Sequence, residues 1–166
     1  MFSKKLITAM LLVLSFNNSA AQACAEKQYR QFDFWLGEWQ VTAETDTVIR
    51  TSKISLINDG CTLLEEYSTP SGYLGKSLNI YDQQTNTWHQ TWTDNAGLLL
   101  LLTGEYANGS MVMTGTTLDK SNNEIINKIT WTANTDGTVR QHWQSQSSDE
   151  KTWQTLFDGT YTKSVN

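Results

Sequence analysis

Turn signals recur along this sequence with a regularity that few folds allow. They are spaced about a dozen residues apart, which is typical of an all-β meander. Asn-Gly and Asp-Gly pairs supply the positive φ angles that tight hairpins need. The signals are Asp59-Gly60, Pro70-Ser71-Gly72, Gln84-Thr85-Asn86, Asn95-Ala96-Gly97, Asn108-Gly109, Ser121-Asn122-Asn123, Asp136-Gly137 and Ser148-Asp149-Glu150.

The segments between these turns are rich in Thr, Val, Ile, Tyr and Trp, which suit a pleated surface. Ten predicted strands result, over 37–43, 48–57, 61–68, 74–82, 87–94, 97–106, 110–118, 123–133, 138–147 and 152–163. Ten sequential antiparallel strands favour a single closed up-and-down β-barrel, because closure removes exposed sheet edges. A two-sheet sandwich is the alternative. Good helix formers over 25–34 predict one short helix before the first strand.

An aromatic stretch, Phe32-Asp33-Phe34-Trp35-Leu36-Gly37-Glu38-Trp39, opens the predicted sheet. Its Gly-x-Trp form is found at the first strand of many small ligand-binding barrels. The indole fills the barrel floor, and the glycine lets the entering chain turn tightly against it. The alternative is a Trp-rich core segment of another β fold.

The N-terminus reads as a secretory signal peptide, residues 1–23, ahead of a single domain over 24–166. Lys4 and Lys5 precede an apolar run over 6–16, and Ala21-Gln22-Ala23 matches a signal-peptidase site. The run is too short to span a bilayer, which takes about 20 residues. We therefore expect a periplasmic or secreted protein, cleaved after Ala23, with no integral membrane segment.

The predicted mature chain is acidic, with ten Lys and Arg against seventeen Asp and Glu. This charge argues against a nucleic-acid or anionic-membrane partner, because no basic surplus is available to neutralise phosphates. Acidity that serves only solubility is the favoured explanation of this composition.

Two cysteines, Cys24 and Cys61, lie in the exported part. In an oxidising compartment two cysteines most often pair, which predicts a disulfide between the N-terminal segment and the third strand. Alternatively, Cys24 is the lipidated first residue of a lipoprotein. Residues 21–23 lack the large aliphatic residue usual before such a cysteine, and Cys61 would be left unpaired.

Strand alternation predicts an inner face that mixes aromatic and polar side chains. In the last strand it places Trp153, Thr155, Phe157 and Tyr161 together. Aromatic walls with a few polar groups are usual in small-molecule sites. The predicted ligand-binding residues are Tyr67, Asn79, Tyr81, Trp88, Gln90, Trp92, Asn127, Trp131, Gln141 and Trp143. In the alternative, a solid barrel, Gln90, Asn127 and Gln141 bond one another across the strands.

Few residues carry a signature of chemistry. Glu65 and Asp94 are candidate catalytic acids or bases if they meet inside the barrel, since burial of Glu65 beside aromatics would raise its pKa. His89 and His142 are predicted to face outward, and no metal site or cofactor is expected. His142 is the one candidate ligand for haem iron. The alternative is that His142 is an exposed imidazole on the surface.

Several further motifs complete a resemblance. They are Asp59-Gly60-Cys61, Tyr81-Asp82, Trp88-His89-Gln90-Thr91-Trp92, Asp94, Ile129-Thr130-Trp131-Thr132, Asp136-Gly137-Thr138-Val139-Arg140-Gln141-His142-Trp143 and Phe157-Asp158-Gly159-Thr160-Tyr161. With the aromatic stretch at 32–39 they resemble an uncharacterised bacterial secreted family, a domain of unknown function, over nearly the whole mature chain. The resemblance implies a calycin-like barrel, related in shape to lipocalins and fatty-acid-binding proteins, with no established activity.

The sequence thus predicts an exported barrel that binds or carries a small amphipathic or aromatic-stacking molecule. An isomerase or hydrolase acting inside the barrel, a haem or nitric-oxide barrel, and a solid protein-interaction module are the alternatives. The sequence specifies neither the ligand nor the oligomeric state.

Overall fold

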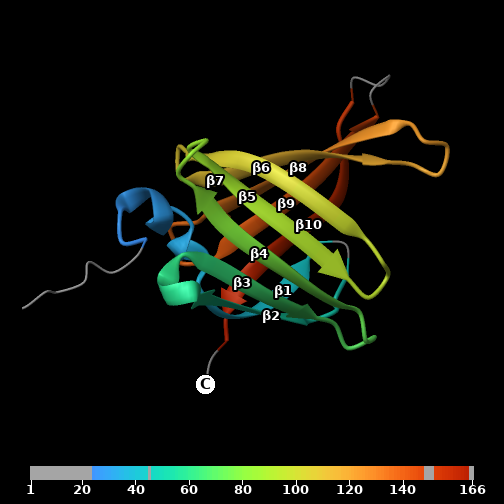
Figure 1. The fold of residues 1–166 in the computed structure, drawn as a ribbon. Helices are drawn as coiled ribbons and strands as arrows, with labels where there is room; N and C mark the ends of the chain where they lie inside the picture. The colour runs from blue at the N-terminus through green and yellow to red at the C-terminus, as the bar shows by residue number, and fades with distance from the viewer. Residues whose placement is uncertain (1–23, 45, 148–151, 165–166) are drawn as a thin grey trace, which may run out of the picture.

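The computed structural model describes residues 24–44, 46–147 and 152–164. The predicted signal peptide and the turn at 148–150 lie outside the described residues. The chain forms one closed barrel in which every neighbouring pair of strands is antiparallel, in the order β1-β10-β9-β8-β7-β6-β5-β4-β3-β2 (Figure 1). Pairing of β1 with β10, from Trp39 opposite Lys163 to Ala43 opposite Gly159, closes the ring.

All ten predicted strands are present, and the barrel, not the sandwich, is the fold. Each strand begins and ends within two residues of its predicted bounds. The predicted helix is two consecutive 3₁₀ turns, η1 (Lys27–Arg30) and η2 (Asp33–Trp35), and a third, η3 (Asn58–Gly60), joins β2 to β3. The strands are β1 (Gly37–Ala43), β2 (Arg50–Ile57), β3 (Thr62–Ser68), β4 (Leu74–Asp82), β5 (Thr87–Asp94), β6 (Leu99–Ala107), β7 (Ser110–Leu118), β8 (Glu124–Ala133), β9 (Val139–Ser147) and β10 (Gln154–Lys163).

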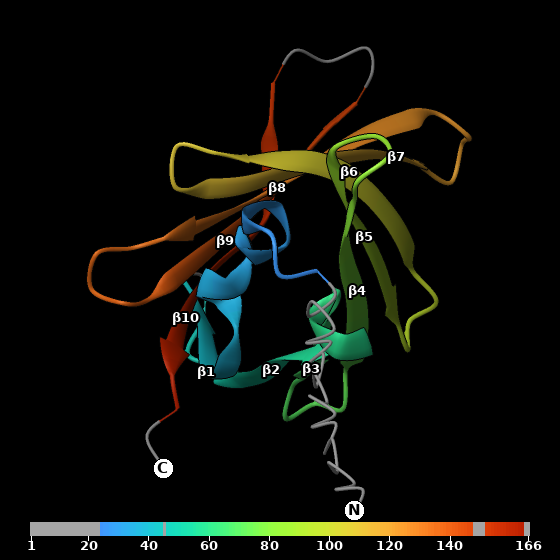
Figure 2. The ribbon, with the colours of Figure 1, turned by 60° about the vertical axis from the view of Figure 1, so that its left-hand side comes forward.

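The two ends of the barrel differ. One end, which we call the closed end, carries the N-terminal turns, and Figure 2 shows η1 and η2 lying within the ring of strands there. Four aromatic side chains, two from this N-terminal segment and two from the strands, fill the closed end and are almost fully buried: Phe32, Trp35, Trp88 and Trp131. Phe32 stacks on Trp35 at 5.0 Å and meets Trp88 and Trp131 edge to face. We call this cluster the aromatic floor.

The Gly-x-Trp motif holds the aromatic floor to β1. Gly37 has φ +127°, a backbone conformation that residues with a side chain rarely adopt, which favours glycine here. Trp39 Nε1 donates to the Trp35 carbonyl at 2.9 Å. Lys163 Nζ lies 3.7 Å from the centre of the Trp39 ring, a cation–π contact between the two closing strands.

A disulfide joins Cys24 to Cys61, as the cysteine count predicts, and ties the N-terminal segment to the start of β3. Because the Cys24 sulfur is bonded to Cys61, it is not a lipid attachment point in this structure. Among the described residues, no helix has the length and apolar character needed to cross a membrane.

Strand alternation predicts the inner face correctly except in β10. Leu156 has no partner where β10 pairs with β9, because the register shifts between Thr155 and Phe157. A bulge of one residue reverses the alternation, so the prediction that Thr155 and Trp153 share the inner face with Phe157 is wrong. Thr155 Oγ1 instead bonds His142 Nε2 at 3.0 Å. The Trp153 ring lies 4.1 Å from Lys128 Nζ.

Candidate functional site

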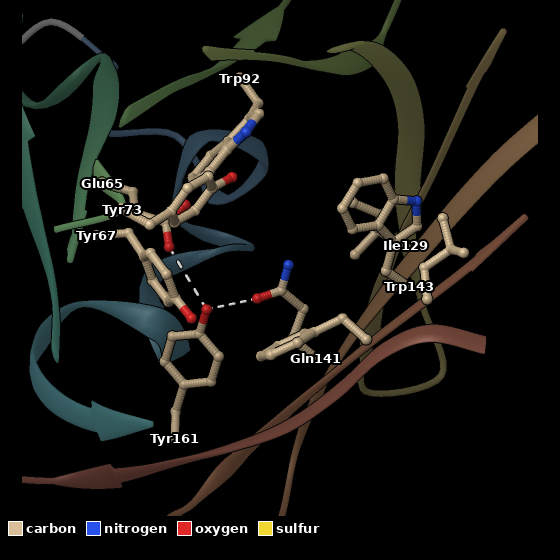
Figure 3. Close-up of a pocket in the computed structure, with 10 residues that line it drawn as sticks. Glu65, Tyr67, Tyr73, Trp92, Ile129, Gln141, Trp143 and Tyr161 are labelled. Carbon is tan, nitrogen blue, oxygen red and sulfur yellow. Dashed lines mark hydrogen bonds between the residues drawn. The ribbon is translucent and has the colours of Figure 1, made fainter. Parts of the chain in front are cut away.

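A cavity of about 190 Å³ occupies the barrel at the end opposite the aromatic floor. We call it the cup (Figure 3). Its lining comes from strands β3, β5, β8, β9 and β10 and from the loop before β4. The lining residues are Glu65, Tyr67, Tyr73, Trp92, Ile129, Gln141, Trp143, Leu156, Phe157 and Tyr161.

The structure divides the residues predicted to bind a ligand into two groups. Four of them, Tyr67, Trp92, Gln141 and Trp143, line the cup together with the catalytic candidate Glu65. The others are buried in the barrel and do not line the cup: Asn79, Tyr81, Trp88, Gln90, Asn127 and Trp131.

Buried polar side chains outside the cup bond one another or a neighbouring strand. Gln90 Nε2 donates to Asn79 Oδ1 at 2.8 Å, and Asn79 Nδ2 donates to Ser77 Oγ at 2.9 Å. Asn127 Oδ1 accepts from Trp143 Nε1 at 3.0 Å. These bonds satisfy groups that would otherwise cost about 1–3 kcal/mol each. In the solid-barrel alternative Gln90, Asn127 and Gln141 bond one another, but in the structure each bonds a different partner: Asn79, Trp143 and Tyr161.

Among the described residues that line the cup, Glu65 is the one with a carboxylate, and it is only 2% exposed. Its Oε1 accepts from Ser52 Oγ and its Oε2 from Ser77 Oγ, both at 3.0 Å. Burial raises the pKa of Glu65 to about 7, although the hydrogen bonds from Ser77, Ser52 and Tyr161 act to lower it. A raised pKa is the direction expected for a buried Glu65, and a pKa of about 7 lets this carboxyl take up or lose a proton close to neutral pH.

Tyr161 links Glu65 to Gln141, as the dashed lines in Figure 3 mark. Its hydroxyl donates to Gln141 Oε1 and lies 3.5 Å from Glu65 Oε1. Burial and the nearby Glu65 raise the Tyr161 pKa well above its ordinary value, so the hydroxyl keeps its proton. A single hydroxyl proton serves one acceptor at a time. When Glu65 is protonated, the carboxyl can donate to Tyr161 while Tyr161 donates to Gln141.

Aromatic rings form facing walls of the cup. Figure 3 shows Tyr67, Tyr73 and Trp92 on the side of Glu65, with Trp143 and Ile129 across the cavity. The Tyr67 ring meets Trp92 at 6.1 Å and Tyr73 at 6.2 Å, both edge to face. Gly75 on β4 makes room for this wall, because a Cβ there would lie 2.2 Å from the Trp92 ring.

Asp94 supports the aromatic wall and does not meet Glu65. Its Oδ2 accepts from Tyr73 Oη at 2.7 Å and from Trp92 Nε1 at 3.3 Å. Its Oδ1 accepts from the backbone N–H groups of Ala96 and Leu98 at the following turn. Partial burial acts to raise the Asp94 pKa, but these hydrogen bonds outweigh it and the pKa is lowered. Asp94 is thus an ionised anchor for two cup residues, not an acid paired with Glu65.

Five further cup residues are absent from the predicted ligand-binding set. Alternation places Ile129, Phe157 and Tyr161 on the inner face, whereas it does not place Tyr73 or Leu156 there. Tyr73 lies in the loop before β4, but it has the same parity as the inner residues Ser77 and Asn79. Continuing that alternation backwards from the strand would have found it. Leu156 has no such signal, because it is the extra residue of the β10 bulge.

The two histidines lie on the outer face, as expected. His142 Nε2 bonds Thr155 Oγ1 and lies 3.9 Å from Asp158 Oδ2, so its imidazole points away from the cup. A haem in the cup would therefore find no ligand in His142. Over residues 24–44, 46–147 and 152–164, no three His, Cys, Asp or Glu side chains gather as a metal site would require.

Comparison with known proteins gives no match, either to a protein-family model or to a curated protein. The cup is therefore the basis on which a function can be assigned.

Proposed function

We propose that this protein is an exported binding or carrier barrel whose small-molecule ligand occupies the cup. The observation that carries this proposal is the asymmetry of the barrel interior. Aromatic side chains fill the closed end, whereas aromatic walls at the other end surround a cavity with Glu65 and Gln141 on its lining. Apolar walls with a few convergent polar groups are the usual composition of a ligand site.

The size of the cup limits the ligand. Its volume of about 190 Å³ is below the roughly 300 Å³ at which sites for drug-sized molecules begin. A single ring with a short chain is the size class that fits. A long acyl chain, the ligand that a fatty-acid carrier would hold, is too large to be enclosed wholly in this cavity.

Export is part of the same proposal. The predicted signal peptide over 1–23 and the Cys24–Cys61 disulfide support a periplasmic or secreted location, where disulfides persist. Membership of the uncharacterised bacterial secreted family that the sequence resembles belongs to the proposal as well.

Native mass spectrometry tests the proposal on mature protein purified gently from its own periplasm. We expect a co-purifying small mass that is lost in Trp92→Ala, which removes one wall of the cup. Trp153→Ala is the matched control, since Trp153 lies against Lys128 outside the cup and its variant should keep the mass. Near-ultraviolet circular dichroism checks that both variants fold. A mass retained equally by Trp92→Ala would contradict the proposal.

Proton transfer is a second candidate function, favoured by Glu65. A carboxyl with a pKa of about 7 in a cavity exchanges protons readily at neutral pH, as a general acid or base must. An isomerase or hydrolase would then convert the molecule held in the cup. Recovery of that molecule unchanged after prolonged incubation from pH 5 to pH 9 would exclude this candidate.

A further inference from the structure

The carboxyl of Glu65 has no cationic partner among the described residues. The hydroxyls of Ser52 and Ser77 and the more distant Tyr161 are its hydrogen-bond donors, and no ion pair includes it. Each carboxylate oxygen can accept more than one hydrogen bond, so capacity remains. A buried carboxylate without a counter-charge is costly, and native proteins usually pair such a group.

The described basic side chains on the surrounding strands have other partners, and none of them forms an ion pair with Glu65. Lys128 and Lys163 lie over the Trp153 and Trp39 rings. On the outer face the pairs are Lys53 with Glu38, Lys76 with Glu66, and Arg140 with Asp158. Arg50, 6.0 Å from the centre of the Phe157 ring, is held by Asp46 through two hydrogen bonds. The titratable groups that face Glu65 are the hydroxyls of Tyr67 and Tyr161, which remain neutral because burial raises both pKa values, to about 12 for Tyr67.

The remaining walls of the cup also favour positive charge. Besides Tyr161, five of the lining residues are aromatic: Tyr67, Tyr73, Trp92, Trp143 and Phe157. The faces of aromatic rings carry negative partial charge and attract organic cations, most strongly where water is excluded. Gln141 Oε1 adds a further hydrogen-bond acceptor on the cup lining.

From this geometry we infer that the ligand of the cup is a small organic ammonium, with its charged nitrogen at Glu65 and its apolar part among the aromatic rings. This inference rests on the proposed function and names the class of ligand. The ammonium carries three N–H donors, and Glu65 and Gln141 offer the acceptors. An anionic ligand would meet the carboxylate without a compensating cation.

Binding of the ammonium is coupled to release of a proton. The cation pairs with the ionised form of Glu65. Because the pKa is about 7, only a small fraction of the protein molecules have this carboxyl ionised at pH 5.5. The apparent affinity is proportional to the fraction of protein molecules in the ionised, binding-competent form. We therefore expect binding to be roughly thirtyfold weaker at pH 5.5 than at pH 8.5. At pH 7 about half a proton leaves per ligand bound.

The experiment compares three probes of one shape and different charge by isothermal titration calorimetry: 2-phenylethylamine, 2-phenylethanol and phenylacetate. We expect the amine to bind at least tenfold more tightly than the alcohol at pH 8.5, with the thirtyfold pH dependence, and the anion to bind least. Glu65→Gln should remove both the preference and the pH dependence. Glu66→Gln, one residue along on the outer face, is the control and should change neither.

The outcomes separate the two levels of the proposal. Equal binding of amine and alcohol, or a preference for the amine that survives in Glu65→Gln, overturns the ammonium inference while leaving the cup a ligand site. If none of the three probes binds at millimolar concentration and no mass co-purifies with the protein, the proposed function fails as well.

Discussion

At the scale of single residues, Glu65 affects both the stability of the fold and the proposed binding of a ligand. Its carboxyl is buried in the barrel, yet it faces a cavity with hydroxyls as its partners. A leucine at this position would be easier to bury. The same burial that raises the pKa makes the charged carboxylate a strong attractor for a cation, because electrostatic interactions are strong where water is excluded.

Glu65→Gln should stabilise the protein at alkaline pH. In the unfolded chain this carboxyl has a pKa of 4.5 and in the folded protein about 7, so the folded state holds the proton more tightly. The free energy of unfolding therefore falls as pH rises from 4.5 through 7 and is level above that window, a loss of roughly 3 kcal/mol from this group. Glu65→Gln should lack that loss.

Urea unfolding at pH 4.5 and pH 8 measures the effect. The variant and the natural protein should be equally stable at pH 4.5, and the variant should be more stable at pH 8 by up to about 3 kcal/mol. Glu66→Gln should follow the natural protein, since Glu66 is exposed and pairs with Lys76. A stability difference between the variant and the natural protein that is the same at both pH values would contradict a raised pKa for Glu65.

At the scale of elements, two local features of strands shape the cup. Gly75 on β4 leaves the space that the Trp92 ring occupies, and the bulge at Leu156 on β10 changes which side chains face inward. Each feature departs from regular alternation of large side chains, and each lies beside the cavity. A regular strand at either place would turn different side chains into the cup.

Gly75→Ala should reduce ligand binding more than it affects the fold. The new Cβ would lie 2.2 Å from the Trp92 ring, so the ring must move into the cup or lose its hydrogen bond to Asp94. Overpacking of this kind costs about 1–3 kcal/mol of stability. We expect the affinity for 2-phenylethylamine to fall at least tenfold. Leu78→Ala, on the outer face of the same strand, is the control, and equal affinity in the two variants would contradict this role for Gly75.

The sequence predicts the elements well because the signals for them are local. Glycine, asparagine and aspartate mark the hairpins, and alternation assigns the inner face wherever a strand is regular. The bulge at Leu156 leaves no local signal, so Thr155 and Trp153 are assigned to the wrong face. Alternation also cannot tell which inner polar residues bond their neighbours, as Gln90 and Asn79 do, and which line the cavity, as Gln141 does.

At the scale of the whole molecule, one end of the barrel is packed with buried aromatic side chains and the other holds the cup. The disulfide holds the N-terminal segment, and that segment brings Phe32 and Trp35 into the barrel as its floor. Well-packed aromatic interiors resist rearrangement. Since the floor residues do not line the cup, we expect them to make no contact with the ligand.

The seven tryptophans report separately on these regions, which makes their indole N–H signals the most direct test of the cup. Trp92 and Trp143 line the cup, Trp35, Trp39, Trp88 and Trp131 are buried outside it, and Trp153 lies against Lys128. The measurement is a nitrogen–proton correlation spectrum of indole-labelled protein, titrated with 2-phenylethylamine and 2-phenylethanol. We expect saturable shifts of the Trp92 and Trp143 signals, while the four buried signals and Trp153 stay in place. Shifts confined to Trp153, or no shift of any indole signal at millimolar probe, would contradict a ligand site in the cup.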